Sequence, residues 1–172
     1  MARPSWTIRP KGERDADAVA ELLASVAREG RYVATEWPFD VAARARAMRD
    51  ALLERRAVGW VAVDGRAIVG DLTLFEIGKP EPELGMIVGA PHRGRGIGRA
   101  LLERALAWAR ANGKSGLSLL VFPDNEPARE LYRTSGFVEI ELRRRAVSRR
   151  DGTALDAIRM RCETPSAERD AR

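Results

Sequence analysis

The sequence predicts a single α/β domain in which a mixed β-sheet carries helices on both faces. Short apolar segments bounded by Gly, Pro or Asp are typical of strands, whereas longer segments with apolar residues three and four positions apart are typical of helices. The order of these segments is strand, two helices, three strands, helix, strand, helix and two strands. The chain has 172 residues, enough for one sizeable core, and contains neither an internal repeat nor an interdomain linker.

Local signals define the individual elements. Asp40 is a good N-cap for a second helix, Asp64-Gly65 favours a hairpin turn, and Asn112-Gly113 signals the end of a helix. The segment from 32 to 39 is irregular and aromatic. Strands are expected at residues 6–9, 57–63, 68–75, 84–88, 117–122, 136–147 and 154–161, and helices at 15–28, 41–56, 97–110 and 126–135.

The stretch from Leu84 to Trp108 organises the chain. A short apolar strand, Leu84–Val88, is followed by a loop rich in Gly and Arg, after which a helix begins. The helix is predicted by a stripe of apolar side chains at helical spacing, namely Ile97, Leu101, Ala105 and Trp108. The unit is therefore strand, glycine-rich turn and helix.

The loop of this unit has the chemistry of an anion site. The first backbone N–H groups of a helix have no partner within it, and the helix dipole makes that end positive. Glycines let an anion approach the main chain, and arginines add positive charge. The residues concerned are Gly94, Gly96, Gly98, Arg93, Arg95 and Arg99. We expect a phosphate or pyrophosphate here, and a turn that merely caps the helix is the alternative.

The spacing of the glycines discriminates between phosphate loops. It is neither the Gly-x-x-x-x-Gly-Lys-Ser/Thr of nucleoside-triphosphate loops nor the Gly-x-Gly-x-x-Gly of dinucleotide folds. Residues 93–98 instead match Arg/Gln-x-x-Gly-x-Gly/Ala, and residues 125–137 match Asn-x-x-Ala-x-x-x-Tyr-x-x-x-Gly-Phe. With both blocks in this order, residues 6–162 resemble the GNAT superfamily of N-acetyltransferases. The resemblance implies a mostly antiparallel sheet.

The resemblance also implies acetyl-CoA as the acyl donor, with no metal. The acyl and pantetheine chain would contact the main chain of Met86, Ile87 and Val88. The pyrophosphate would lie on the loop residues Arg93, Gly94, Arg95, Gly96, Gly98 and Arg99. Asn125 matches the family's Asn near the pantetheine arm.

The implied reaction is direct transfer of the acetyl group to an amine. A base must take a proton from the amine, and the leaving thiolate needs a proton. Tyr132 matches the family's proton donor, with core packing as the alternative. Glu83 resembles the family's base, with a surface carboxylate as the alternative, and Glu36 is a second candidate for the base. The single Cys, Cys162, has no matched His, which favours a ternary complex over a covalent route.

The sequence gives few indications of the residues that bind the acceptor. In the family the early helices and their loop cover it, which makes Tyr32, Glu36, Trp37 and Phe39 candidate acceptor-binding residues. A hydrophobic plug is the alternative for this segment, which resembles that of small-molecule amine acetyltransferases such as the phosphinothricin type. His92, the only His, is expected beside the phosphates and not as a catalyst.

The composition limits the classes of ligand and the cellular compartment that we expect. Thirty Lys and Arg against 25 Asp and Glu give a net charge of +5, which suits an anionic cofactor as well as nucleic acid. Five arginines at 143–145 and 149–150 are interpreted as a solvated hairpin, since no nucleic-acid-binding motif accompanies them. One Cys, no signal core and no membrane-length apolar run favour a cytoplasmic enzyme. The domain is expected at residues 1–163, with a polar tail at 164–172.

Three functions stay open at this point. The first is acetylation of a small-molecule amine or amino acid, and the second is acetylation of a protein N-terminus or lysine on the same scaffold. The third is a non-catalytic acyl-CoA sensor or a basic nucleic-acid-binding protein. A closed acceptor pocket would favour the first over the second, and an open groove the reverse. No pattern sets the oligomeric state, and a homodimer stays open.

Overall fold

The computed structural model describes residues 5–164 as one mixed sheet between two pairs of helices. Its strands are β1 (Trp6–Pro10), β2 (Ala57–Asp64), β3 (Ala67–Phe75), β4 (Glu83–Val88), β5 (Gly116–Val121), β6 (Val138–Ser148) and β7 (Ala154–Glu163). Its α-helices are α1 (Ala16–Ala27), α2 (Val41–Leu53), α3 (Ile97–Ala111) and α4 (Glu126–Thr134), with short 3-10 turns at Glu13–Asp15 and Ala90–His92.

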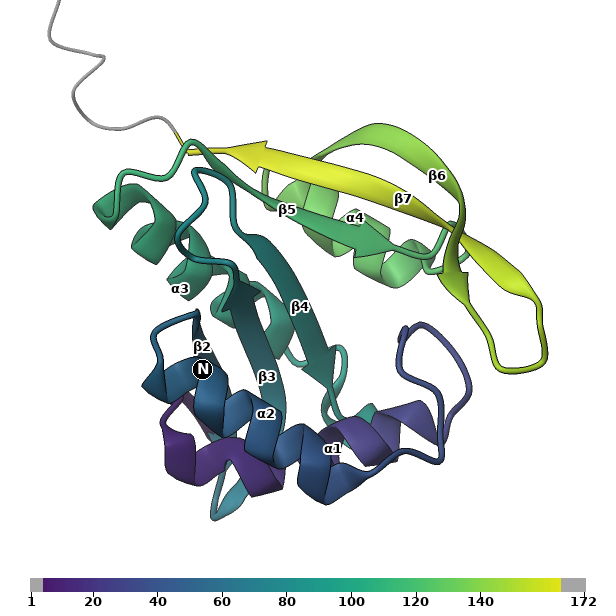
Figure 1. The fold of residues 1–172 in the computed structure, drawn as a ribbon. Helices are drawn as coiled ribbons and strands as arrows, with labels where there is room; N and C mark the ends of the chain where they lie inside the picture. The colour runs from purple at the N-terminus through teal and green to yellow at the C-terminus, as the bar shows by residue number, and fades with distance from the viewer. Residues whose placement is uncertain (1–4, 165–172) are drawn as a thin grey trace, which may run out of the picture.

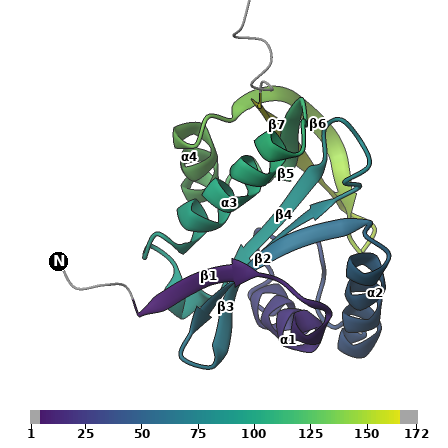
Figure 2. The ribbon, with the colours of Figure 1, turned by 90° about the vertical axis from the view of Figure 1, so that its left-hand side faces the viewer.

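The sheet has the strand order β1-β2-β3-β4-β5-β7-β6. Every neighbouring pair is antiparallel except β4 and β5, which are parallel. Helices α1 and α2 cover one face, and α3 and α4 cover the other (Figures 1 and 2). The predicted fold class and order of elements are confirmed. No helix within residues 5–164 is long and apolar enough to cross a membrane.

The predicted bounds of helices and strands agree with the structure to within two residues, except at the end of the second helix. The second helix ends at Leu53 and not at residue 56, because Arg55 adopts a left-handed φ of 56° and the Arg56 N–H donates back to Ala51 O at 2.9 Å. Thr164, the first residue of the predicted tail, is buried, and its hydroxyl donates to Lys114 O at 2.7 Å. Residues 1–4 and 165–172 lie outside the described residues.

The main core lies between the sheet and α3. The predicted stripe of α3 is confirmed, with Ile97, Leu101 and Ala105 buried and Trp108 half-buried against the same core. Gly70 on β3 permits this close packing, because a Cβ there would lie 2.9 Å from Ile97 Cγ2. Helix α3 is thereby fixed against the centre of the sheet.

A buried ion pair lies on the opposite face of the sheet, under α1 and α2. The Lys11 ammonium donates to Asp71 Oδ1 at 2.7 Å and to the hydroxyl of Thr73, which in turn donates to Asp71 Oδ2 at 3.0 Å. The two charged side chains are 0% and 7% exposed. Burial raises the pKa of Asp71, and the adjacent Lys11 opposes that rise. Each partner therefore makes burial of the other tolerable.

Replacing Lys11 by Met should destabilise the fold strongly, because Asp71 would keep a buried charge without its partner. Breaking a buried pair in this way costs about 3–5 kcal/mol. The loss in free energy of unfolding relative to the parent should become smaller at acid pH, where protonation of Asp71 removes the unpaired charge. Urea denaturation measures both effects.

The pair Arg9–Asp15 provides the matched control, since the side chains of Arg9 and Asp15 are 48% and 13% exposed, more than those of the buried pair. Arg9→Met should lower the free energy of unfolding by less than about 1 kcal/mol. Equal losses in the two variants would contradict the structural role given to the buried pair.

Candidate active site

The centre of the sheet opens where β4 and β5 meet. These strands are paired at one position only, Glu83 with Ser118, and their C-terminal ends diverge (Figure 1). On its other edge β4 is paired with β3 along its whole length. In the part of the chain that the structure describes, no strand pairs with the β5-facing edge of residues 86–88. The main-chain groups of Met86 and the Val88 N–H therefore border the opening. The groups of Ile87 face β3, and Val88 O accepts from Arg93 Nε at 2.9 Å.

The side chains of the same segment serve packing. Met86 and Val88 pack against the main core, and Met86 Cε lies 3.5 Å from the position that a Cβ of Gly98 would occupy. Side chains alternate along a strand, so Ile87 faces the opposite side, toward α1 and α2. Packing of the Met86 and Val88 side chains in the core is compatible with the predicted ligand contact of the main chain, which stays a prediction.

The glycine-rich loop presents the N-terminus of α3. Gly94 and Gly96 have φ values of 71° and 82°, in the left-handed region that favours glycine. Gly96 is the N-cap of α3, and no side chain caps this helix. The first N–H groups of α3 are thus left to an external acceptor. By contrast, α4 is capped by Asn125, whose Oδ1 accepts from the Ala128 N–H at 3.4 Å.

Two of the loop arginines are held by carboxylates. Arg93 binds both carboxylate oxygens of Glu29 at 2.8 and 2.7 Å, and its Nε donates to Val88 O at 2.9 Å. Arg95 lies 3.2 Å from the carboxylate of Asp64. Their positive charges are largely compensated within the protein. No signal in the sequence indicated Glu29 or Asp64 as partners.

Arg99 differs from the other loop arginines. Its guanidinium donates to the hydroxyl of Thr134 on α4 at 2.9 Å, and no carboxylate in residues 5–164 forms a salt bridge with it. Arg99 therefore carries the uncompensated charge of the loop. His92 lies beside the loop as expected, with Nδ1 2.9 Å from Arg95 Nη1.

Tyr132 combines a buried ring with an unpaired hydroxyl. It lies on α4, is 6% exposed, and its ring centroid is 5.8 Å from that of Phe137. Its hydroxyl makes no hydrogen bond among the described residues 5–164. Burial raises the pKa of Tyr132 to about 12, so the phenol keeps its proton at neutral pH. The ring packs in the core, and the proton remains available to a ligand.

Glu83 is an exposed carboxylate at the start of β4. The next residue, Leu84, is buried in the main core, so Glu83 points to the face covered by α1 and α2. Its strand partner on β3 is Phe75, whose ring atom Cε2 lies 3.3 Å from where a Cβ of Gly85 would be. Within residues 5–164 no salt bridge neutralises Glu83. Glu83 is thus a carboxylate without an ion-pair partner in this part of the chain, and it lies opposite the Phe75 residue of β3.

The loop between α1 and α2 contains the predicted acceptor residues. The Tyr32 hydroxyl donates to Asp124 O at 3.2 Å, across to the β5–α4 loop. Trp37 and Phe39 pack edge to face with centroids 5.9 Å apart, and the Arg28 guanidinium lies 4.0 Å from the Trp37 ring centroid. Trp37 is 39% exposed and neither aromatic belongs to a core cluster, so this pair does not plug the core.

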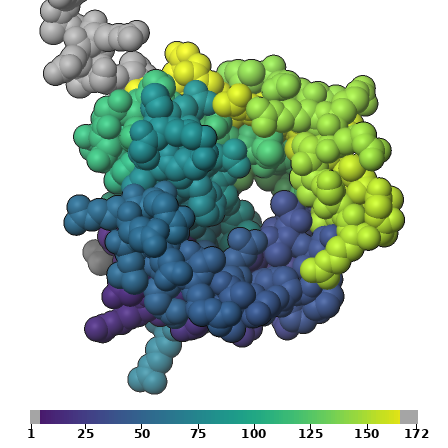
Figure 3. Space-filling view, in the orientation of Figure 1, coloured from purple at the N-terminus to yellow at the C-terminus, as the bar shows by residue number. Residues whose placement is uncertain are grey.

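The β6–β7 hairpin reaches the same loop. Arg149 donates to Val33 O and Ala34 O, each at 3.2 Å, and the Arg150 N–H donates to Glu36 Oε2 at 2.9 Å. The prediction of a solvated hairpin is therefore wrong for Arg149. Nothing in the sequence signals a contact across 115 residues. Figure 3 shows an opening in the molecular surface between this loop and the hairpin.

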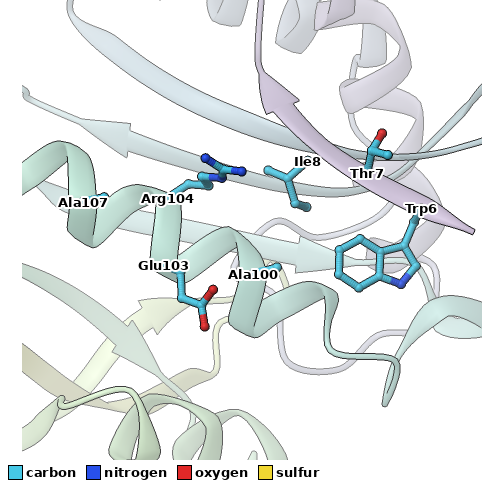
Figure 4. A pocket seen from close by; sticks show the side chains of 7 residues that line it. All are labelled: Trp6, Thr7, Ile8, Ala100, Glu103, Arg104 and Ala107. Atoms are coloured by element: carbon cyan, nitrogen blue, oxygen red, sulfur yellow. The ribbon is translucent and has the colours of Figure 1, made fainter. Parts of the chain in front are cut away.

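A separate hollow of about 570 Å³ lies between β1 and α3. Trp6 and Ile8 approach it from β1, and Arg104 reaches over it from α3 (Figure 4). Its lining includes none of the residues that the sequence singled out. The described residues contain no group of three His, Cys, Asp or Glu placed to hold a metal ion.

The family model described as "Acetyltransferase (GNAT) family" matches residues 18–137, which include the glycine-rich loop and Tyr132. The chain belongs to this family. The resemblance that the two sequence blocks carried is thereby confirmed.

Two curated relatives match part of this GNAT family member. The mycothiol acetyltransferase of Beutenbergia cavernae is 47% identical over 57 residues, which are 33% of this chain and 18% of that protein. The N-alpha-acetyltransferase RimI of Mycobacterium tuberculosis is 39% identical over 88 residues, 49% of this chain and 54% of that protein. The chain thus spans about half or less of the length of these relatives.

Solved structures of the superfamily share the fold. The phosphinothricin acetyltransferase (Pat) of Sinorhizobium meliloti in complex with AcCoA has a TM-score of 0.79 at 21% identity, covering 96% of this chain and 92% of that one. At this identity the likeness shows the fold alone.

Proposed function

We propose that this protein is an acetyl-CoA-dependent N-acetyltransferase that acts on a primary amine of a small molecule or amino acid. The observation that carries the proposal is the opening between β4 and β5, with the uncapped N-terminus of α3 at its border. Helix α4 packs against that end of α3, since a Cβ at Gly98 would lie 2.8 Å from Leu131 Cδ2. Tyr132, the next residue, brings a proton donor to the same region.

The residues fit acetyl-CoA, the group held in the Sinorhizobium meliloti structure. In the proposed pantetheine segment of Met86, Ile87 and Val88, the main-chain groups of Met86 and the Val88 N–H suit the amides of a pantetheine arm, as a neighbouring strand would. The backbone N–H groups of residues 94–99 and the uncompensated Arg99 suit the pyrophosphate. Arg93 and Arg95, already paired with carboxylates, support the loop. Asn125 holds the start of α4 beside this path.

Gly96→Glu should weaken coenzyme A binding, because it puts a negative charge where the pyrophosphate is expected and a side chain at a φ of 82°. We expect the dissociation constant to rise at least about tenfold, equivalent to 1.4 kcal/mol. Isothermal titration calorimetry with coenzyme A measures it.

Gly113→Glu is the matched control, because Gly113 also has a left-handed φ, of 62°, but follows the opposite end of α3. The backbone strain and the charge change are the same in both variants. Unchanged affinity in a folded Gly96→Glu variant, or an equal loss in the control, would contradict the assignment of the loop.

Glu83 is the proposed base. An amine attacks only in its neutral form, and a free carboxylate on the acceptor face can take the proton directly or through water. Glu83→Gln should lower turnover most at low pH, where neutral amine is scarce, and least at high pH. A pH–rate profile identical to that of the parent enzyme would move the role to Glu36.

Tyr132 is the proposed acid, which donates its phenol proton to the thiolate sulfur of the leaving coenzyme A. Because its pKa is raised to about 12, Tyr132 stays protonated, and its ionisation should not reduce activity below about pH 11. Tyr132→Phe keeps the ring, so stability and coenzyme A affinity should survive while turnover falls about 10²-fold. Single-turnover kinetics measure the chemical step. A change of only a few fold would leave Tyr132 a packing residue.

A second candidate function is acetylation of a protein N-terminus, favoured by the 39% identity to RimI over 88 residues. Thiol release from acetyl-CoA, followed across a panel of small amines, amino acids and peptides with a free N-terminus, tests both candidates. Release with small amines supports the first, and release only with peptides supports the second. Coenzyme A binding without release for any amine would contradict both.

A further inference from the structure

The loop between α1 and α2 is tied to three other parts of the molecule. We call residues 29–36 the bridge. Glu29 at its start binds Arg93 of the glycine-rich loop, Tyr32 binds the β5–α4 loop, and its later residues bind the β6–β7 hairpin. The bridge therefore connects the glycine-rich loop, the β5–α4 loop and the β6–β7 hairpin.

Arg149 makes the main contact between the bridge and the hairpin. Its planar guanidinium donates to two consecutive carbonyls, those of Val33 and Ala34. Its Cζ also lies 5.7 Å from the ring centroid of Phe122, which is buried at the end of β5. Within residues 5–164 no carboxylate forms a salt bridge with Arg149. The two parallel N–H donors of the planar guanidinium match the two adjacent carbonyls, a fixed geometry that a lysine ammonium lacks.

Because Arg149 joins the bridge to the hairpin, these two segments form a closed ring around the opening where the acceptor is expected. The opening in Figure 3 is bounded by the bridge below and by the hairpin on the right. A small amine can enter such a ring end-on. A polypeptide acceptor must also place the residues after its first one, each adding about 3.3 Å of extended chain, and these meet the bridge or the hairpin.

We propose that Arg149 is a specificity-determining residue, which keeps the ring closed and thereby selects small amines over polypeptide N-termini. This inference rests on the proposed acetyltransferase activity and adds the acceptor class to it. It assigns a selective role to a residue outside the family's two sequence blocks.

Arg149→Ala tests the inference. The ratio of kcat/KM for a hexapeptide with a free N-terminus to kcat/KM for a small primary amine should rise at least about tenfold, mainly through a lower KM for the peptide. Arg149→Lys should raise this ratio by less than Arg149→Ala, because an ammonium keeps donors for the carbonyls but lacks the planar fork of the guanidinium. Arg150→Ala is the matched control, since only the main-chain N–H of Arg150 contacts the bridge. Its ratio should equal that of the parent.

Hydrogen exchange supplies a readout that does not depend on activity. The amides of residues 31–37 should exchange faster in Arg149→Ala and at the parent rate in Arg150→Ala. An unchanged exchange rate in Arg149→Ala would show that Arg149 does not hold the bridge. A faster rate with an unchanged peptide-to-amine ratio of kcat/KM would contradict its role in selectivity. A parent that acetylates the hexapeptide as efficiently as small amines would overturn the inference alone. A parent that acetylates no amine would overturn the proposed function, and the inference with it.

Discussion

One pair of residues, Glu83 and Ser118, joins the two halves of the sheet. Beyond it β4 and β5 separate, and the free main-chain groups would otherwise favour a complete ladder. The halves stay in register because one continuous core beneath them contains residues of both, such as Leu72 and Leu117. The opening, the loop at its border and the bridge above it all depend on this early end of the pairing.

The features that could be predicted from the sequence are those set by interactions between residues close together in the chain. Asp40 caps α2 as expected, with Oδ1 accepting from the Ala43 N–H at 2.8 Å, and the apolar stripe of α3 is buried. The strand, turn and helix unit is found where the glycines and the apolar spacing place it. These features involve residues a few positions apart, for which propensity, capping and periodicity are sufficient.

The partners of charged side chains could not be predicted in the same way. Arg93 pairs with Glu29 across 64 residues, and Arg149 reaches Val33 across 116. A flexible cation has many possible partners, and the tertiary fold selects among them. The sequence thus indicated three loop arginines as equals, whereas the structure leaves Arg99 as the one with uncompensated charge. The acceptor face was the least predictable part, because it is assembled from such long-range contacts.

The bridge also affects the entropy of binding. A free loop loses about 1–2 kcal/mol of backbone entropy for each residue that a ligand orders. Here Glu29, Tyr32, Val33, Ala34 and Glu36 are held by hydrogen bonds to other parts of the chain. If the bridge contacts the acceptor as proposed, binding would lose less free energy to ordering of the chain than it would with a free loop.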